Sequence, residues 1–478
     1  MNISTPIFKT AIAIGIIASI YYSCKSNNKT ESLTSNIENN SLTEYAKLPF
    51  SLGLPLATTI PGFRNRDSLV AFLQDASDDF SWRTFIGLNW PADADGNPDT
   101  AAHFGDNERF TVLEHWMPST SIYRENNLEP KPWNYKFLDS KNEATVDHGM
   151  RLIAKLKKFD NENPENEHLI DQNKNYTYYE VFYNKQAYDY VKKGKLYNKA
   201  GQQEFAKKLP SITEGLKVTE NGKPLNIEKT FKRAYLPVGN FKDSTKIVGN
   251  QTLNFIINPG AIIVKTAWKE IAANDDKSKF FITKVKYKGK EEIVLGLVGM
   301  HIMHKVAEAT QWVWSSFAHV DNAPQMNPDG SVQLEPGVKY NYFNTKNLDK
   351  STFNKLPDTS NTEKIPTQVV SILPAQKNPD KFNKKYLDLI KKYDSKSVWQ
   401  YYRLLGTQWP FKETLFTNGD DYQPSLLANP VMETFFQANS SCMKCHSQAR
   451  FLKKDPITKK HGMNADFVWG IANVANKR

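Results

Sequence analysis

The chain has 478 residues, which is enough to bury a large hydrophobic core. Its composition of 40% hydrophobic and 12% aromatic residues excludes an intrinsically disordered protein. The net charge of +11 comes with lysines scattered along the whole chain, so no basic stripe indicates a nucleic-acid partner.

The N-terminus has the pattern of an export signal. The apolar run AIAIGIIASI (11–20) is too short for a helix that crosses a hydrocarbon core of about 30 Å. The next residues, YYSC (21–24), resemble the cleavage box of bacterial lipoproteins, although Tyr21 stands where these signals usually have Leu. The resemblance implies a signal peptide at 1–23 and an acylated Cys24 that anchors the protein to a lipid membrane. A short uncleaved anchor, or a secretory signal in which Cys24 is incidental, is the alternative.

Residues 24–47 are polar and nearly free of apolar side chains, which is typical of a solvated tether. A mixed, β-rich body is expected at 48–380. In it, DSLVAFLQDA (67–76) has helical spacing of apolar residues and leads into the aromatic SWRTFIGLNWP (81–91), which we assign to the core. DADGNPDT (93–100) alternates acidic and Asn residues like a calcium loop, but it lacks the Gly and Glu that such a loop requires and is predicted to be a turn.

The middle of the body has the composition of β-strands. Its segments rich in β-branched and aromatic residues are YTYYEVFY (176–183), TLNFIINPGAIIVKTAW (252–268), FFITKVKY (280–287), EIVLGLVGMHIMHK (292–305) and QWVWSSFAHV (311–320). Residues 288–291 are a plausible hairpin turn between the third and fourth segments. Together the segments predict a central antiparallel sheet. Residues 322–380, rich in Asn, Pro, Asp, Ser and Lys, predict long surface loops.

The C-terminal region, 381–478, is expected to be helical. FNKKYLDLIKKYDSKSVWQYYRLL (382–405) has helical periodicity, and NPVMETFFQ (429–437) contains Pro430, which suits a first helical turn. The whole chain is therefore predicted to have an α+β fold, with an antiparallel sheet at its centre and a helical C-terminal part.

Two of the three cysteines lie in the motif CMKCH (442–446). Cys442 and Cys445 fall on one helical turn and can each add to a vinyl group of the same porphyrin, while His446 is carried under the iron as a ligand. Covalent haem attachment needs an exported, oxidising compartment, which the N-terminal signal indicates independently. The alternatives are a redox dithiol, which does not need His446, and half of a zinc site, which would need two more Cys or His ligands.

Around SSCMKCHSQA (440–449) the chain resembles c-type cytochromes. The segments FSWRTFIGLNWP, WVWSSFAHVDNAP and NPVMETFFQ also look like those of a family of large bacterial proteins with a single haem. The resemblance implies export and one covalent haem c. It implies no substrate, because no reaction is established for that family.

We expect an electron-transfer protein, anchored at the periplasmic side or the outer membrane, that exchanges single electrons with a redox partner protein. The alternative is a haem c-dependent oxidoreductase or a small-ligand sensor with an open distal site, since the chain is larger than electron carriage requires. The sequence contains no P-loop, dinucleotide fingerprint or nucleophile triad.

The sixth iron ligand has several candidates with suitable donor atoms: His301, His304, His319, Met432 and Met463. A strand at 292–305 would send His301 and His304 to opposite faces, because three positions separate them. We favour His301, in phase with Leu297 and Met303, as axial ligand or as distal hydrogen-bond donor.

The other candidates are weaker. Met463 is the next choice, if its segment folds back, and Met432 is more simply part of the core. His304, at the charged end of its strand, is expected to be solvated or to act as a cap, and His319 to make a structural hydrogen bond. For His301 the alternative is a buried, hydrogen-bonded core histidine.

Overall fold

The computed structural model describes residues 66–476 in part, and these belong to one compact unit, 42–478. The described residues exclude 107–108, 134–168, 210–211, 221–222, 232, 249–250, 286–292, 307–311, 357–363, 374–376, 411–421 and 453–461. The predicted signal peptide 1–23, Cys24 and the tether 24–47 lie outside the described residues, as does the hairpin turn 288–291. No helix in the described part of the chain is long and apolar enough to cross a membrane.

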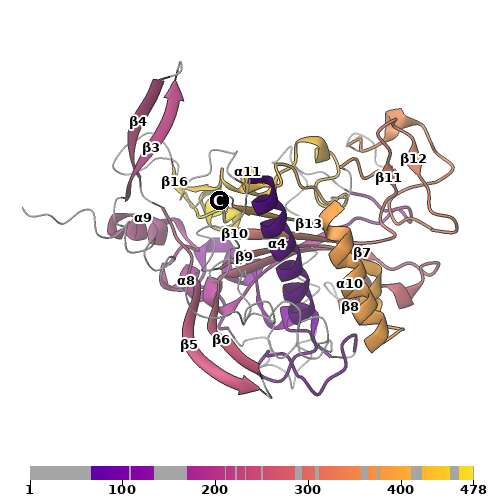
Figure 1. The fold of residues 1–478 in the computed structure, drawn as a ribbon, viewed down its shortest axis with the longest axis horizontal. Helices are drawn as coiled ribbons and strands as arrows, with labels where there is room; N and C mark the ends of the chain where they lie inside the picture. Colours follow the sequence, from indigo (N-terminus) through magenta and orange to yellow (C-terminus); the bar gives the residue numbers. More distant parts are fainter. Residues whose placement is uncertain are drawn as a thin grey trace, which may run out of the picture. The chain divides into compact units, whose positions relative to one another are not determined.

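An antiparallel sheet forms the centre of the unit, which confirms the predicted α+β fold (Figure 1). In the described residues its eight strands are β1 (Met117–Pro118), β2 (Tyr178–Tyr183), β7 (Ile262–Glu270), β8 (Ile282–Val285), β9 (Ile293–Lys305), β10 (Trp312–His319), β13 (Tyr402–Pro410) and β14 (Tyr422–Gln423). They pair in the order β1-β2-β7-β9-β10-β13-β14, with β8 also on β9. Each predicted β-segment contributes a strand to this sheet.

The segment 252–268 is divided into two strands. Its first part is β6 (Gln251–Gly260), which pairs with β5 (Val238–Val248) in a separate hairpin, and its second part is β7. The chain turns at Gly260, whose φ is +80° and where a Cβ would lie 2.3 Å from the carbonyl oxygen of Lys305. A glycine is required there because it alone tolerates both the left-handed backbone and this close approach.

An irregularity in β9 decides which residues face which side of the sheet. The pairing of β9 with β7 shifts by one residue at Val298. As a result, Leu297 and Met300 pack into the same core cluster although three positions separate them. Met303 packs into the cluster on the opposite face, toward which His301 also points. The prediction that Leu297 is in phase with His301 was wrong, because one extra residue inverts the alternation.

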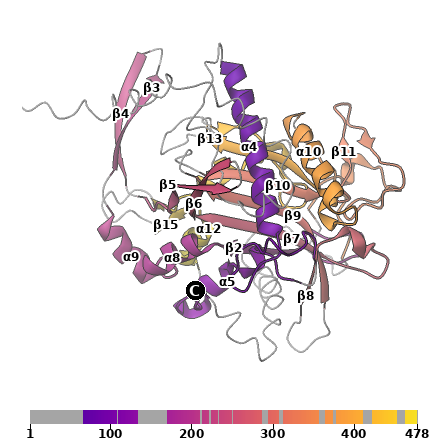
Figure 2. The ribbon, with the colours of Figure 1, turned by 60° about the horizontal axis from the view of Figure 1, so that its bottom comes forward.

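Two helices cover the first face of the sheet, α4 (Arg66–Asn89) and α10 (Lys377–Tyr393), which lie side by side in both views (Figures 1 and 2). Helix α4 confirms the predicted helix at 67–76 and continues through the aromatic segment. Its Phe85 stacks on Phe317 of β10 with 4.3 Å between ring centroids, and its Trp82 stacks on Tyr386 of α10 at 5.5 Å. Such offset aromatic pairs add to the free energy gained from burying the rings.

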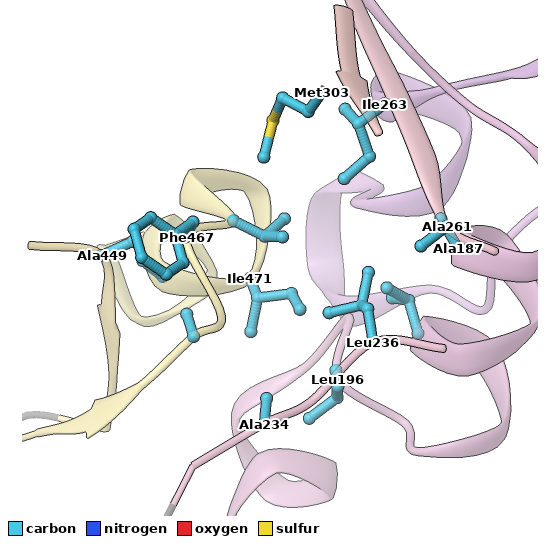
Figure 3. Close-up of a cluster of buried hydrophobic side chains, with 14 of the residues drawn as sticks. Ala187, Leu196, Ala234, Leu236, Ala261, Ile263, Met303, Ala449, Phe467 and Ile471 are labelled. Carbon is cyan, nitrogen blue, oxygen red and sulfur yellow. The ribbon is translucent and has the colours of Figure 1, made fainter. Parts of the chain in front are cut away.

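The opposite face is covered by short C-terminal elements and by two helices from the middle of the chain. These are α11 (Cys442–His446), β15 (Arg450–Phe451), β16 (Met463–Asn464), α12 (Trp469–Ala472), α8 (Lys185–Lys193) and α9 (Lys199–Lys208). Figure 3 shows Phe467 and Ile471 of the C-terminal segment in one apolar cluster with Ile263 and Met303 of the sheet. The C-terminal segment is thus packed on the face toward which His301 points.

The C-terminal region contains strands as well as helices. The periodic segment 382–405 is helical only to Tyr393, and Tyr402–Pro410 form β13, whose first side chains alternate between buried and half-buried as in a strand. The prediction of a helix at 429–437 was wrong, because these residues form turns and end in one 3-10 turn. The Asn429 side chain accepts a hydrogen bond from the amide of Val431 at 3.1 Å, which favours a turn over a helix.

The remaining elements are short or lie in separate hairpins. They are α5 (Ser119–Ile122), β3 (Ile212–Glu220), β4 (Lys223–Phe231), β11 (Gln325–Met326), β12 (Val332–Gln333), and 3-10 turns at Leu113–His115, Glu125–Asn127, Lys277–Lys279, Lys350–Thr352, Val398–Tyr401, Gln437–Asn439 and Asn473–Asn476. The predicted turn at 93–100 is closed by Asp93, whose side chain accepts from the amides of Asp95 and Asn97. Residues 322–380 are largely irregular where described, as predicted, but Tyr342 and Val369 are fully buried, so these loops do not lie wholly on the surface.

Candidate functional site

The CMKCH motif forms the short helix α11 against strand β13. Ser441 caps its N-terminus by accepting a hydrogen bond from the amide of Lys444. Gln408 of β13 is fully buried, accepts from the amide of Met443 at 2.7 Å and donates to the hydroxyl of Ser441 at 3.0 Å. Its amide group also donates to the carbonyl oxygen of Pro424 at 2.7 Å. One side chain of the sheet therefore holds the helix that presents both thiols and the imidazole.

Two contacts hold the imidazole of His446, one at a ring nitrogen and one on a face of the ring. Its Nδ1 donates to the carbonyl oxygen of Phe467 at 2.7 Å, in the tautomer that this acceptor requires. Its ring contacts Trp314 of β10, with 4.4 Å between centroids and 59° between planes. Burial lowers the pKa of His446 to about 3, so the ring is neutral at physiological pH. A neutral imidazole with Nδ1 engaged by a carbonyl has its Nε2 lone pair free for a metal.

The two thiols of α11 differ in exposure. Cys442 is buried, Cys445 is exposed, and neither forms a disulfide. Burial, and then the charges of Glu433 and Cys445, raise the pKa of the Cys442 thiol well above its usual value. A redox dithiol needs a thiol with a lowered pKa, because the thiolate is the nucleophile. A neutral thioether, in contrast, suits the buried position.

His301 lies on the face of the sheet that carries α11. Its side chain is 9% exposed, and its Nε2 has no hydrogen-bond partner among the described residues. A carboxylate oxygen of Glu433 is 3.5 Å from this nitrogen, beyond good hydrogen-bond length. Burial, assisted by the charge of Lys265, lowers the pKa of His301 to about 3. His301 is also among the causes of the lowered pKa of His446, because two charged imidazoles at these positions would repel one another.

The pairing of the strands explains how His301 comes to lie near α11. Residues that are paired across neighbouring strands form a row of the sheet. Met303 pairs with Trp314, and Trp314 pairs with Gln408, so one row carries the contacts to α11. In the next row His301 pairs with Ser316 of β10 on one side and with Lys265 of β7 on the other. The antiparallel register thus places the His301 row directly beside the row that holds the CMKCH helix.

Sequence reasoning missed the charged neighbours of His301. Burial raises the pKa of Glu433 to about 7, although the charge of Lys265 and a hydrogen bond from the amide of Asn429 lower it. The signal in the sequence was a single Lys within the apolar run AIIVKTAW and a single Glu among the aromatic residues of NPVMETFFQ. A charged residue isolated in such runs is buried and paired more often than it is solvated.

The other histidine candidates lie elsewhere. His304 faces α4, with its ring 5.1 Å from that of Phe80 and its Nε2 hydrogen-bonded to the carbonyl oxygen of Pro259 at 2.8 Å. His304 was expected to be solvated or to act as a cap, and the first of these was wrong, because α4 covers that end of the strand and leaves the residue 1% exposed. His319 makes the expected structural hydrogen bonds, to the carbonyl oxygen of Lys279 and from the amide of Asp321.

Both methionine candidates are buried in apolar clusters. Met432 packs beside Val431 against Gly299, where a Cβ would lie 2.8 Å from a methyl group of Val431. Met463 in β16 packs into the buried apolar cluster that also contains Met303 and Phe467. Its segment folds back onto the sheet, as an approach to the site requires, but it lies there with ordinary apolar neighbours.

In the described part of the chain, no three His, Cys, Asp or Glu side chains converge in a way that could hold a bare metal ion. Donors on this face include the two thiols of α11, the Nε2 of His446 and the buried Nε2 of His301, which has no hydrogen-bond partner among the described residues. This set fits a haem c, which takes two thioether links and one or two axial nitrogen ligands. No protein-family model, curated protein or solved structure matches the chain.

Proposed function

We propose that this chain is a c-type cytochrome in which Cys442 and Cys445 bind one haem covalently and His446 is its proximal ligand. The observation that carries the proposal is the state of His446: a neutral imidazole, held at Nδ1 by the carbonyl of Phe467, on the same helical turn as two cysteines that form no disulfide. That combination presents a haem with both attachment points and one axial nitrogen at once.

We propose His301 as the sixth ligand and electron transfer as the function. The buried Nε2 of His301 has no hydrogen-bond partner among the described residues, and ligation to iron would give it one. The haem would supply a site that takes up and releases single electrons. The chain's own residues orient the two imidazoles from a rigid sheet and a short helix, and the apolar cluster around Met303 and Phe467 excludes water. A fixed ligand set surrounded by apolar side chains favours electron transfer over chemistry at the iron.

We further propose that the protein is exported and anchored by an acylated Cys24 at the periplasmic side or the outer membrane, where it exchanges electrons with a redox partner protein. The support is the apolar run that ends at Ser23-Cys24. An exported location also agrees with the covalent attachment of haem, which bacteria carry out outside the cytoplasm.

Mass spectrometry of protein expressed with a haem-attachment system tests the first proposal. We expect one haem addition on the native chain, none on the Cys442→Ser/Cys445→Ser variant, and an unchanged addition on Met443→Leu, a volume-conserving change between the two cysteines. A native protein without any haem addition would contradict the proposal.

Carbon monoxide separates electron transfer from the alternative with an open distal site. A reduced haem with two strong protein ligands should give the same optical spectrum with and without carbon monoxide. A carbon monoxide adduct of the native protein would remove His301 as a firm ligand. It would favour an oxidoreductase or sensor in which Lys265 and Glu433 flank the open position.

A further inference from the structure

The carbonyl group that holds His446 belongs to an unusual piece of backbone. Asp466 and Phe467 both have positive φ, of 52° and 66°, although neither is a glycine. Residues with a Cβ adopt this left-handed conformation at a cost, and two in succession persist only where the surroundings hold them. The turn directs the carbonyl oxygen of Phe467 at Nδ1 of His446.

Asp466 anchors this turn from inside the protein. One carboxylate oxygen accepts from Arg233 at 2.5 Å, and the other accepts from Lys305 and from the amide of Leu236 at 2.7 Å. The backbone is held too, since the carbonyl oxygen of Asp466 accepts from the indole of Trp312 at 3.0 Å. The carboxylate therefore has several donors, and the backbone on one side of the Phe467 carbonyl is fixed.

The anchor contains three buried charged groups. The side chains of Arg233, Lys305 and Asp466 are at most 1% exposed, and two cations face one carboxylate. Tyr235 lies against both cations, with its ring centroid 3.4 Å from Nζ of Lys305 and 5.0 Å from the Arg233 guanidinium carbon. The free energy needed to remove these charges from water opposes most of the attraction between them, so a buried ion pair adds little to stability. The anchor is better explained by the backbone geometry that it imposes.

Strands β9 and β10 supply both the residues that anchor Asp466 and the residue that contacts the ring of His446. Lys305 of β9 pairs with Trp312 of β10, and two residues along each strand Met303 pairs with Trp314. Trp312 and Lys305 hold Asp466, whereas Trp314 contacts the ring of His446. The sheet therefore fixes the acceptor carbonyl and the ring plane of His446 relative to one another.

We infer that Asp466, with Lys305 and Arg233, is a positioning device that locks the Phe467 carbonyl onto His446 and so sets the electron-donating strength of the proximal imidazole. This inference rests on the proposed haem ligation by His446. A hydrogen bond from Nδ1 to a carbonyl makes Nε2 a stronger donor, which stabilises the oxidised form of a bound haem. Loss of the lock weakens that bond and raises the midpoint potential.

The test compares two double variants, each of which replaces one buried lysine and the carboxylate that it contacts. Lys305→Met/Asp466→Asn removes part of the anchor, and Lys269→Met/Asp275→Asn removes a buried pair of 2.5 Å distant from His446 in the sheet. We expect both to retain one haem by mass. The anchor variant should show an upward shift of the midpoint potential and loss or broadening of the His446 Nδ1–H proton resonance, whereas the control should keep the native values of both.

Lys305→Met alone, which keeps the bond between Arg233 and Asp466, should shift the potential in the same direction by a smaller amount, and it serves if the double variant does not fold. Haem-loaded anchor variants with native potential and native Nδ1–H resonance would overturn the inference alone. A wild-type protein that carries no haem would overturn the proposed function, and this inference with it.

Discussion

Burial decides the protonation state of the single side chains in the site. It lowers the pKa of His301 and His446 to about 3 and raises that of Cys442 well above its usual value. All three groups are therefore uncharged at physiological pH. Uncharged imidazoles are the form that binds iron, and an uncharged sulfur is the form left after thioether formation.

His301→Ala tests the proposed sixth ligand. We expect a changed haem spectrum, a new carbon monoxide adduct, and a midpoint potential shifted on the order of 0.1 V, within the roughly 0.8 V over which axial ligands set haem potentials. His304→Ala is the matched control, because His304 lies three residues along the same strand but faces α4. A native spectrum and potential in His301→Ala would exclude His301 from the site.

A different buried side chain, Asp78 of α4, makes stability depend on pH. Burial raises its pKa from 3.8 to about 7, although hydrogen bonds from Thr407 and Gln74 lower it in part. Its Oδ2 has no hydrogen-bond partner within the described residues. The folded state thus binds a proton that the unfolded state has released, so the free energy of unfolding falls as pH rises from about 4 to 7.

Asp78→Asn removes this penalty and keeps an oxygen that can accept from Gln74. The variant should gain stability relative to the native protein as pH rises, by roughly 3 kcal/mol more at pH 8 than at pH 5. Urea unfolding at both pH values measures the difference. An advantage of the variant that is equal at the two pH values would show that Asp78 does not titrate in this range.

At the scale of elements, a five-residue helix cannot hold its own position. Helix α11 is too short to be stable alone, and its first turn depends on Ser441 and on Gln408 of β13. The direction of a side chain in β9 also depends on the pairing with its neighbour. One extra residue at Val298, relative to β7, decides that His301 faces α11. The site is therefore assembled by contacts between elements rather than within them.

Gln408→Leu tests that dependence. The substitution leaves the buried amide of Met443 without its acceptor, which should lower the free energy of unfolding by roughly 1–3 kcal/mol and reduce the fraction of chains that carry haem. Asn383→Leu is the control, because Asn383 is also buried and hydrogen-bonded but lies on the α4 face. Equal haem content in the two variants would show that α11 is held without Gln408.

At the scale of the whole molecule, the two faces of the sheet are covered by different kinds of elements. On one face α4 and α10 form an aromatic core, and on the other a C-terminal segment of short elements carries the site (Figure 1). A rigid sheet between them would hold the proposed ligand set unchanged during the proposed electron exchange.

The proposed membrane anchor concerns the whole molecule and lies outside the described residues. Cys24→Ala should release the protein from the membrane fraction to the soluble fraction of a native-type host, because acyl chains on Cys24 would otherwise hold it there. Fractionation followed by immunodetection measures the distribution. A Cys24→Ala variant that stays with the membranes would indicate an uncleaved anchor instead.

Much of the local structure was readable from the sequence. Helix α4, the five predicted β-segments and the turn at 93–100 follow from apolar periodicity and turn residues, which depend on near neighbours in the chain. The predicted helix at 382–405 was wrong at its C-terminal end, because the bulky residues from Tyr402 onward suit a strand as well as a helix and pair with β10 in the sheet.

The sequence by itself determined the spacing of CMKCH, because a motif within one helical turn needs no other part of the chain to define it. Only the tertiary structure decided what surrounds that motif. The carbonyl of Phe467, its anchor at Lys305 and the position of His301 depend on β-sheet register, a bulge and a buried ion pair. The buried ion pair joins residues 161 positions apart, and no local pattern in the chain encodes which of these residues meet.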